Sequence, residues 1–523
     1  MRDEEETSAP AGSAAFDWHP EPDLIAYRDP REAREGLARL GEETWRTALD
    51  WLYDEAMRRP VGPDSYPELR RRFFGESLRP APAPRKPSSS DEILREFRER
   101  LAPYQFGAQN PRAFSYFTPP PLPISIAGEV LSQWVHQGVD VWHAGPSAAL
   151  VEEEVTAWLR ELVGFGEGSW GVLTSGGVMA NVMGLTAARD VHLAKLLGID
   201  HRPRGAELEG VRVYASDQAH FSIRRALDVL GFPAETLRVV PSDERFRLRG
   251  ADVAEAVAAD RAADLLPFAI AAVCGSTNTG SVDETGPLAD VAERENLWLH
   301  VDAAYGGAAR LSPRDAALVP DLERADSVTV DPHKWFFQAY DIGGLVVRRR
   351  DDLAVAFHGD PEYYRSSNPD DEPLNWYQFS LEGTRRFRAL KLWFSWKHLG
   401  TDGLGRLVER NVDLARYMAA RIAESDDFEA APPAPDLSVV CFRHLPGGRS
   451  AAAAADPSKL DAHQDRLQRA LEVSGVGWVS TTKLRGRTHL RAGIINYMST
   501  EADVDAVLDA LRDQAARGSS TGA

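Results

Sequence analysis

Residues 297–304 read LWLHVDAA and residues 327–334 read SVTVDPHK, and each apolar run leads into polar or small side chains. Near-continuous apolar runs of this length are typical of strands buried on both faces of a parallel sheet. Ligands of such sheets bind beyond the carboxyl ends of the strands. We therefore expect Asp302 and Lys334 to lie at the ligand-binding edge of one sheet.

The same pattern extends through the middle of the chain. Helical patterns separate several short apolar runs, which occur also at 169–175, 210–216, 236–242, 268–276 and 343–349. Strands that alternate with helices predict an α/β fold with a mostly parallel sheet. We assign residues 119–395 to this large domain.

The flanking regions have a different composition. Residues 1–22 are acidic and rich in small residues, and residues 516–523 are small and polar, so both are predicted to be disordered tails. Residues 23–118 combine amphipathic helical patterns with a proline-rich linker and have little core of their own, which predicts a helical dimerisation segment. Residues 396–515 predict a smaller α+β domain.

Composition and charge exclude several classes of protein. Sixty basic and seventy-nine acidic residues give a net charge of −19, which disfavours nucleic acid and anionic membranes as partners. The two cysteines, Cys274 and Cys441, exclude a disulfide framework and disfavour a multi-cysteine metal site. Because neither a membrane-spanning stretch nor a signal-peptide pattern is found, we expect a cytoplasmic protein.

Asp302 and Lys334 together indicate a particular cofactor. A lysine at the rim of a core can be desolvated and attack a carbonyl group, and a buried carboxylate needs a cationic or hydrogen-bonding partner. An aldehyde cofactor with a basic ring nitrogen satisfies both residues, because lysine forms the imine and aspartate pairs with the protonated ring. This is the arrangement that binds pyridoxal 5'-phosphate.

Three further features fit the same cofactor. Ser175-Gly176-Gly177 lies between a strand and a helix, where small residues and a helix N-terminus suit a phosphate group. His220 follows another strand, from which an imidazole can stack on the cofactor ring. Ala304 is small enough for a flat ring to lie against it. Taken alone, Ser175-Gly176-Gly177 is more typical of an ordinary strand–helix turn, and His220 is more typical of a capping or hydrogen-bonded histidine.

Five motifs then follow one another along the chain: TSGGVMAN (174–181), SDQAH (216–220), LHVDAAYGG (299–307), DPHKW (331–335) and RRFRALKLW (385–393). In order and spacing they resemble the group II pyridoxal-phosphate-dependent amino acid decarboxylases, most closely the aromatic L-amino acid decarboxylase branch. The resemblance implies a type I aminotransferase-like fold and a homodimer with shared active sites.

The resemblance also implies roles for individual residues. Lys334 would form the Schiff base with the cofactor, Asp302 would pair with the pyridine nitrogen, and His220 would stack on the ring. Further cofactor contacts are implied for Ala304 beneath the ring, for Gly177, Val178 and Ser327 at the phosphate, and for Thr277 and His333 close by. Asp331 stands where relatives often have asparagine, and its role is open.

The resemblance implies decarboxylation of an L-amino acid, an aromatic one in the nearest branch, to the amine and CO2. Residues 359–383 form a long polar connection, which suggests a mobile lid. In the family this loop carries a tyrosine that protonates the substrate carbon. That position falls at Trp376 or Tyr377, and we predict Tyr377. Because phenylalanine there is associated with aldehyde formation in relatives, a tyrosine favours simple decarboxylation.

The substrate side chain is less well defined by the motifs. Phe114, Tyr116, Phe117 and Trp142 resemble the aromatic surroundings of an aromatic substrate. Arg112 could instead recognise an acidic side chain, so a glutamate- or aspartate-type decarboxylase stays open. An aromatic aldehyde synthase, a transaminase or other lyase with the same cofactor, and a non-catalytic member of the fold are further alternatives.

Overall fold

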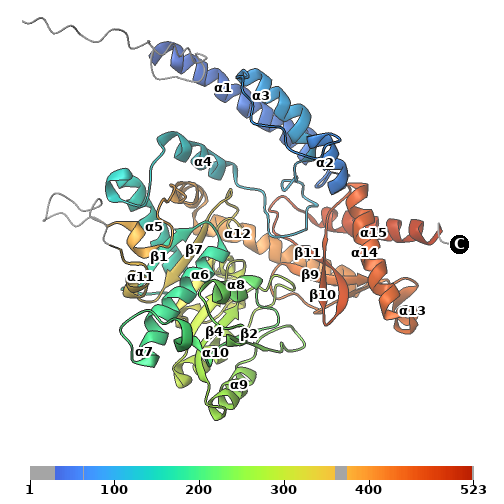
Figure 1. Ribbon diagram of the computed structural model, residues 1–523. Helices are drawn as coiled ribbons and strands as arrows, with labels where there is room; N and C mark the ends of the chain where they lie inside the picture. The colour runs from blue at the N-terminus through green and yellow to red at the C-terminus, as the bar shows by residue number, and fades with distance from the viewer. Residues whose placement is uncertain (1–29, 63, 360–373, 521–523) are drawn as a thin grey trace, which may run out of the picture. The chain divides into compact units, whose positions relative to one another are not determined.

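The computed structural model describes residues 30–62, 64–359 and 374–520 (Figure 1). The chain divides into two compact units: Met1–Arg58 with Asp64–Phe106, and Arg59–Pro63 with Gly107–Ala523. The larger unit contains both sheets. The predicted tail at 1–22 lies outside the described residues.

The smaller unit is helical and has almost no core. It consists of α1 (Pro30–Trp51), α2 (Tyr66–Phe74) and α3 (Ser90–Glu96) with the short turns η1 (Leu52–Ala56), η2 (Phe97–Leu101) and η3 (Ala102–Tyr104). Trp51 Nε1 donates a hydrogen bond to Ala102 O at 3.0 Å. Among the described residues of this unit, the buried ones are Thr47, Ala56 and Ala102. So few buried side chains contribute little hydrophobic stabilisation.

The large sheet confirms the predicted α/β fold. Its seven strands lie in the order β1-β7-β6-β5-β4-β2-β3, and only β7 runs antiparallel to its neighbours. Each strand coincides with one of the seven predicted apolar runs. The strands are β1 (Trp170–Thr174), β2 (Val211–Ser216), β3 (Leu237–Val240), β4 (Leu266–Val273), β5 (Trp298–Asp302), β6 (Ser327–Val330) and β7 (Gly343–Val347).

Helices cover both faces of this sheet. α6 and α8 pack against each other, and α9 packs against α10; right-handed crossovers place these two pairs on opposite faces. α5 packs on β1 and β7, and α12 packs on α4 and α5. The helices are α4 (Pro123–Val135), α5 (Pro146–Leu162), α6 (Gly177–Ala187), α7 (Ala194–Leu197), α8 (Phe221–Val229), α9 (Gly250–Ala262), α10 (Thr285–Glu295), α11 (Arg350–Phe357) and α12 (Ala389–Ala423).

A second, antiparallel sheet lies in the C-terminal part of the larger unit, as Figure 1 shows. Its order is β10-β11-β9-β8, and helices α14 and α15 accompany it. A separate cluster of buried side chains, which includes Leu414, Phe442, Leu490 and Leu508, forms its core. The elements are β8 (Phe428–Ala430), β9 (Val439–His444), β10 (Ser480–Leu484), β11 (Arg487–Gly493), α13 (Gly448–Ala454), α14 (Pro457–Ser474) and α15 (Glu501–Ser520).

The ends of the predicted segments differ from the observed elements. The expected limit at residue 395 falls inside α12, shortly before Gly400, whose φ of 66° interrupts the helix. The predicted disordered tail from residue 516 is wrong as far as Ser520, because α15 continues to that residue. Among the described residues, no helix is both long and apolar enough to cross a bilayer.

Candidate active site

The carboxyl ends of three parallel strands meet at one edge of the large sheet. Asp302 is the last residue of β5, Lys334 follows β6, and β1 leads through Gly176 into α6. Because β1, β6 and β5 run in one direction, their ends gather these residues at the edge where ligands of such sheets bind.

Asp331 connects the lysine to the start of α6. Its Oδ2 lies 3.2 Å from Lys334 Nζ and accepts a hydrogen bond from the Gly177 N–H at 2.9 Å. His333 Nε2 lies 3.8 Å from the same oxygen. The Asp331 side chain is 2% exposed and that of Lys334 is 24% exposed. The structure therefore brings Lys334, His333 and Gly177 together around one buried carboxylate.

Three glycines allow the backbone to approach this cluster closely. A Cβ on Gly177 would lie 2.7 Å from Asp331 Oδ2, and one on Gly343 would lie 2.5 Å from Gly176 Cα. Since such distances are shorter than real contacts, larger residues are excluded at both positions. Val178 follows as the second residue of α6, so its amide also lies at the unsatisfied N-terminus of the helix. The segment has the features expected of an anion cradle.

Asn181, on α6, holds the carboxylate of Asp302. Its Nδ2 donates to Asp302 Oδ2 and to Ser222 Oγ, both at 2.8 Å. Ser222 Oγ lies 2.8 Å from His220 Nδ1. The Ala304 N–H donates to Asp302 Oδ1 at 3.1 Å. A continuous chain of hydrogen bonds thus joins Asp302 to His220.

The sequence analysis did not single out Asn181. Thr329 Oγ1 donates to its Oδ1 at 2.7 Å, and His300 Nε2 lies 3.0 Å from the same atom. A signal for its role was present, because one amide side chain in the apolar helix GVMANVMGLTA requires a polar partner once buried.

Burial also keeps the nearby imidazoles neutral. It lowers the pKa of His220 and of His333, and the positive charge of Lys334 acts in the same direction, whereas nearby carboxylates oppose it. Burial lowers the pKa of His300 to about 4. Near neutral pH these imidazoles are therefore uncharged, which suits His220 for stacking on a ring.

The prediction that Ser327 binds the phosphate is wrong. Its side chain is fully buried, and its Oγ accepts a hydrogen bond from Trp298 Nε1 at 2.9 Å and lies 2.8 Å from His300 Nδ1. Ser327 begins β6, whereas the cradle lies beyond the other end of that strand. Its hydroxyl is engaged inside the core and cannot reach the cradle.

The prediction for Phe114 is also wrong. This ring is fully buried in the core of the antiparallel sheet, and its N–H donates to Trp478 O at 2.8 Å. Arg112 is paired with the same residue, because its carbonyl accepts the Trp478 N–H at 3.0 Å. Tyr116 is exposed and packs edge-on against the Trp478 ring.

Phe117 contacts the segments that carry Asp302 and Lys334. Its ring stacks on Tyr305 at 4.2 Å between centroids, and Tyr305 stacks on Trp335 at 4.8 Å. The Arg491 guanidinium lies over the Phe117 ring, 4.7 Å from its centroid. Arg491 Nε donates to Thr277 O at 2.8 Å, which connects the predicted residue Thr277 to the aromatic stack.

Trp376 and Tyr377 lie at the outer edge of β1. Both belong to the 3₁₀ turn η12 (Trp376–Phe379), and the Trp376 ring is buried against Trp170. The Tyr377 N–H donates to Asp140 O at 3.2 Å, and Asn375 Oδ1 accepts the Trp142 N–H at 3.0 Å. These hydrogen bonds join the turn η12 to the segment that precedes α5. Of the predicted lid, residues 360–373 lie outside the described residues.

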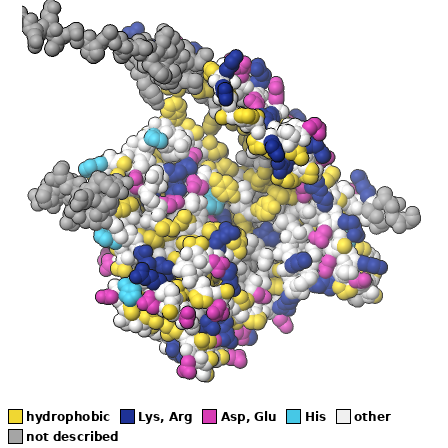
Figure 2. Space-filling model, in the orientation of Figure 1, with side chains coloured by type: hydrophobic (Ala, Val, Ile, Leu, Met, Phe, Trp, Pro, Cys, Tyr) yellow, Lys and Arg dark blue, Asp and Glu magenta, His cyan; other side chains and the backbone are white. Residues whose placement is uncertain are grey.

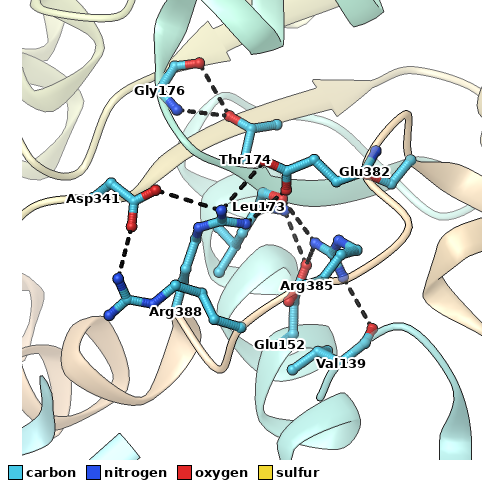
Figure 3. Close-up of polar contacts among 11 residues, drawn as sticks. Val139, Glu152, Leu173, Thr174, Gly176, Asp341, Glu382, Arg385 and Arg388 are labelled. Carbon is cyan, nitrogen blue, oxygen red and sulfur yellow. Dashed lines mark hydrogen bonds and ion pairs between the residues drawn. The ribbon is translucent and has the colours of Figure 1, made fainter. Parts of the chain in front are cut away.

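A buried ion pair supports the strand that leads into the cradle. Arg385 and Glu152 point toward one another in Figure 3, and the pair is almost fully buried. Arg385 Nη2 donates to Leu173 O at 2.7 Å, and Glu152 Oε1 accepts the Leu173 N–H at 3.0 Å. The next residue, Thr174, receives a hydrogen bond from the Gly176 N–H at 3.2 Å. The motif RRFR therefore stabilises the end of β1.

Comparison with known proteins gives the family. Residues 74–445 match the pyridoxal-dependent decarboxylase conserved domain. The chain belongs to this family. An aromatic-L-amino-acid decarboxylase of Bacillus atrophaeus is 30% identical over 471 residues, 90% of this chain and 93% of that protein. A phenylacetaldehyde synthase of Petunia hybrida is 29% identical, over 84% of this chain and 87% of that protein.

A solved structure shares the fold of this decarboxylase. The crystal structure of Oryza sativa TDC with PLP and tryptamine superposes with a TM-score of 0.84 at 27% identity, and covers 92% of this chain and 98% of that one. The observed fold thus agrees with the predicted fold class, and the chain is a pyridoxal-phosphate-dependent carboxy-lyase.

The residues of this decarboxylase fit the cofactor. The amides of Gly177 and Val178 would be available to a phosphate, and a Cβ added to Gly177 would fill part of this cradle. Asp302, held by Asn181, would accept a hydrogen bond from a protonated ring nitrogen, and Lys334 would provide an amine. Inside the same region, Arg491 Nη2 is buried without a hydrogen-bond partner among the described residues, which is typical of a site for a ligand acceptor.

Proposed function

We propose that this decarboxylase converts an aromatic L-amino acid to the corresponding amine and CO2. The observation that carries the proposal is the stack of Phe117, Tyr305 and Trp335. Trp335 directly follows Lys334, and Tyr305 directly follows Ala304. Phe117 is the partly buried member of this stack, so an aromatic side chain bound near Lys334 would meet the edge of its ring.

The residues of the site have distinct roles in this proposal. Bound pyridoxal phosphate supplies the electron sink for the bond that breaks. Lys334 holds the cofactor through its amine, and Asp302 keeps the proton on the ring nitrogen, because Asn181 and the Ala304 amide fix its carboxylate. His220 covers the ring in its neutral form. Gly177 and Val178 donate backbone hydrogen bonds to the phosphate.

Arg491 is the cation proposed to meet a carboxylate of the substrate. It is almost fully buried, and its Nε is already used by Thr277 O, which leaves Nη2 for a ligand. Every amino acid has a carboxylate, so this contact supports an amino acid substrate without selecting its side chain. Arg112 was the candidate for an acidic side chain, and its position beside Trp478 gives that alternative no support.

Tyr377 is proposed as the proton donor to the substrate carbon. Trp376 is unsuited to this role because its indole is buried against Trp170 and has no acidic proton. From its place at the edge of β1, Tyr377 would reach a substrate after movement of the segment that carries it, or from a partner subunit. Water would be excluded when that segment covers the site.

A homodimer is the proposed assembly. In α4 the polar and small residues Ser125, Gly128 and Ser132 are buried. The exposed residues of this helix include the apolar side chains Val130, Leu131, Trp134 and Val135. Figure 2 shows hydrophobic side chains gathered on the visible face of the larger unit between α4 and the second sheet. An apolar helix face of this kind indicates a protein interface, and a second copy also gives the core-poor smaller unit a surface on which to pack.

Light scattering of the double variant Leu131→Glu, Trp134→Glu tests the dimer. We expect a dimeric wild type and a monomeric, inactive variant, whereas Val355→Glu, at an exposed position of α11, should stay dimeric. A monomeric wild type with full activity would contradict the proposal.

We also propose a cytoplasmic location, because Cys274 and Cys441 are both free and buried, as in proteins of reducing compartments.

A substrate screen tests the reaction itself. The cofactor-loaded protein is incubated with the common L-amino acids and L-DOPA, and amines, aldehydes and CO2 are measured. We expect an amine and CO2 in equal amounts from an aromatic substrate. An aldehyde with peroxide would identify an aldehyde synthase instead, and an amine from glutamate or aspartate would contradict the aromatic assignment.

A further inference from the structure

Asp331 takes a place in the cradle that suits a phosphate oxygen. Its Oδ2 accepts the N–H of Gly177, the first residue of α6, at 2.9 Å. No side chain of its own segment caps that helix, so a carboxylate from the turn after β6 serves this purpose. A negative charge is stabilised at such a helix end. The amide is the one proposed to bind the cofactor phosphate.

The surroundings of Asp331 are built to admit this carboxylate. A Cβ on Gly343 would lie 2.6 Å from Asp331 Oδ1, and one on Gly177 would lie 2.7 Å from Oδ2. The Oδ1 atom is buried and has no hydrogen-bond partner among the described residues. A buried carboxylate oxygen without a donor is costly. Gly177 N–H and Lys334 Nζ, which hold Asp331 in this place, therefore both contact the same oxygen, Oδ2.

The charges that face Asp331 come from two segments. Lys334 Nζ, 3.2 Å away, and His333 Nε2, 3.8 Å away, belong to its own turn. His220, which precedes α8, also senses the charge of Asp331. Burial lowers the pKa of both histidines, so Lys334 is the positive charge that balances the carboxylate near neutral pH.

We propose that Asp331 is an internal anion that competes with the cofactor phosphate for the Gly177 amide and for the charge of Lys334. When the phosphate binds, the Gly177 N–H passes from Asp331 to a phosphate oxygen. Asp331 and the phosphate then place like charges in one cradle beside Lys334, and no covalent bond is made or broken in this exchange. The inference rests on the proposed placement of the phosphate at Gly177.

The proposal makes phosphate affinity depend on the charge at position 331. Two negative groups share one small cradle, and their repulsion disfavours phosphate binding. Asparagine at position 331 has nearly the same size and can still accept the Gly177 N–H, but carries no charge. Asp331→Asn should therefore bind a phosphorylated ligand more tightly.

The test uses apoenzyme and a ligand that cannot react with Lys334. Pyridoxine 5'-phosphate has the ring and the phosphate but no aldehyde, and pyridoxine lacks the phosphate as well. Equilibrium dialysis should give about tenfold tighter binding of pyridoxine 5'-phosphate to Asp331→Asn than to wild type. Pyridoxine should bind both proteins equally. Asp326→Asn, a carboxylate just before β6, is the matched control and should behave as wild type.

Equal or weaker binding of pyridoxine 5'-phosphate to Asp331→Asn would overturn the inference. If that variant does not fold, Asp331→Ser removes the same charge and should also bind this ligand more tightly than wild type, and equal binding there would contradict the proposal. Failure of the cofactor assignment is distinguishable, because wild type would then not retain pyridoxal phosphate at all.

Discussion

Asn181 Nδ2 lies 2.8 Å from Asp302 Oδ2, and the same amide group reaches Ser222 Oγ at 2.8 Å. One side chain on α6 thus fixes the carboxylate at the end of β5 and links it, through Ser222, to His220. This amide therefore joins α6 to the end of β5 and to α8. The carboxylate is held ready to accept a hydrogen bond from a ring nitrogen before any ligand arrives.

Asn181→Ala should weaken both stability and cofactor retention. It leaves Asp302 Oδ2 and Thr329 Oγ1 without their hydrogen bonds to Asn181, which should lower the free energy of unfolding by about 2 kcal/mol. Urea unfolding and dialysis against cofactor-free buffer measure the two effects. Thr186→Val is the matched control, because Thr186 lies on the same helix and donates only to Val182 O. Equal cofactor retention in the two variants would show that Asn181 does not position Asp302.

Arg385→Met should destabilise the protein strongly. It leaves the Glu152 carboxylate buried without a counter-charge, which costs about 3–5 kcal/mol. The double variant Arg385→Met, Glu152→Gln removes that charge while it keeps an acceptor for the Leu173 N–H, so it should recover part of the loss. Chemical denaturation compares the three proteins. A single variant as stable as the double variant would contradict the role assigned to the pair.

The fold could be predicted from the sequence to a large extent. Each of the seven apolar runs became a strand. Six of these strands are almost wholly buried, whereas β3, at the edge of the sheet, is mostly half-buried or exposed. The carboxyl ends of parallel strands lie at one edge of a sheet, and this rule correctly predicted that Asp302 and Lys334 lie at the same edge of the large sheet. Applied to Ser327, the same rule would have excluded it, because this residue begins its strand and the site lies beyond the end of it.

Other positions depend on contacts that a local pattern does not contain. Phe114 and Phe117 are three residues apart in one aromatic loop, yet one ring enters the core of the second sheet and the other stacks on Tyr305. The partner of Phe114 in backbone pairing is Trp478, far along the chain. Which ring faces a site is decided by that long-range pairing and not by composition.

Stability should fall in acid partly because of His300. Burial lowers its pKa from 6.5 to about 4, so between these values the unfolded chain binds the proton and the folded protein does not. Stability is therefore retained above about pH 6.5 and lost as the pH falls toward 4, by up to about 3 kcal/mol from this group. His300→Gln should flatten the dependence of unfolding free energy on pH. An unchanged slope between pH 6.5 and 4 would contradict a neutral buried His300.

Tyr377→Phe should slow amine formation and divert part of the product to an aldehyde, because no acid then delivers a proton to the substrate carbon. Mass spectrometry of the products measures the ratio of aldehyde to amine. Tyr363→Phe and Tyr364→Phe, in the neighbouring stretch outside the described residues, are the comparisons. If either of these variants shows the effect while Tyr377→Phe keeps the wild-type rate and product, the proton donor has been assigned to the wrong tyrosine.

The most direct test of the account is to locate the cofactor on the chain. The cofactor-loaded protein is reduced with borohydride, digested and analysed by mass spectrometry, with Lys334→Ala as the control. We expect a reduced pyridoxyl phosphate group on Lys334 alone, beside Asp331 in the segment DPHKW, and none on the variant. A modification on another lysine, or retention of the group by Lys334→Ala, would contradict the site described here.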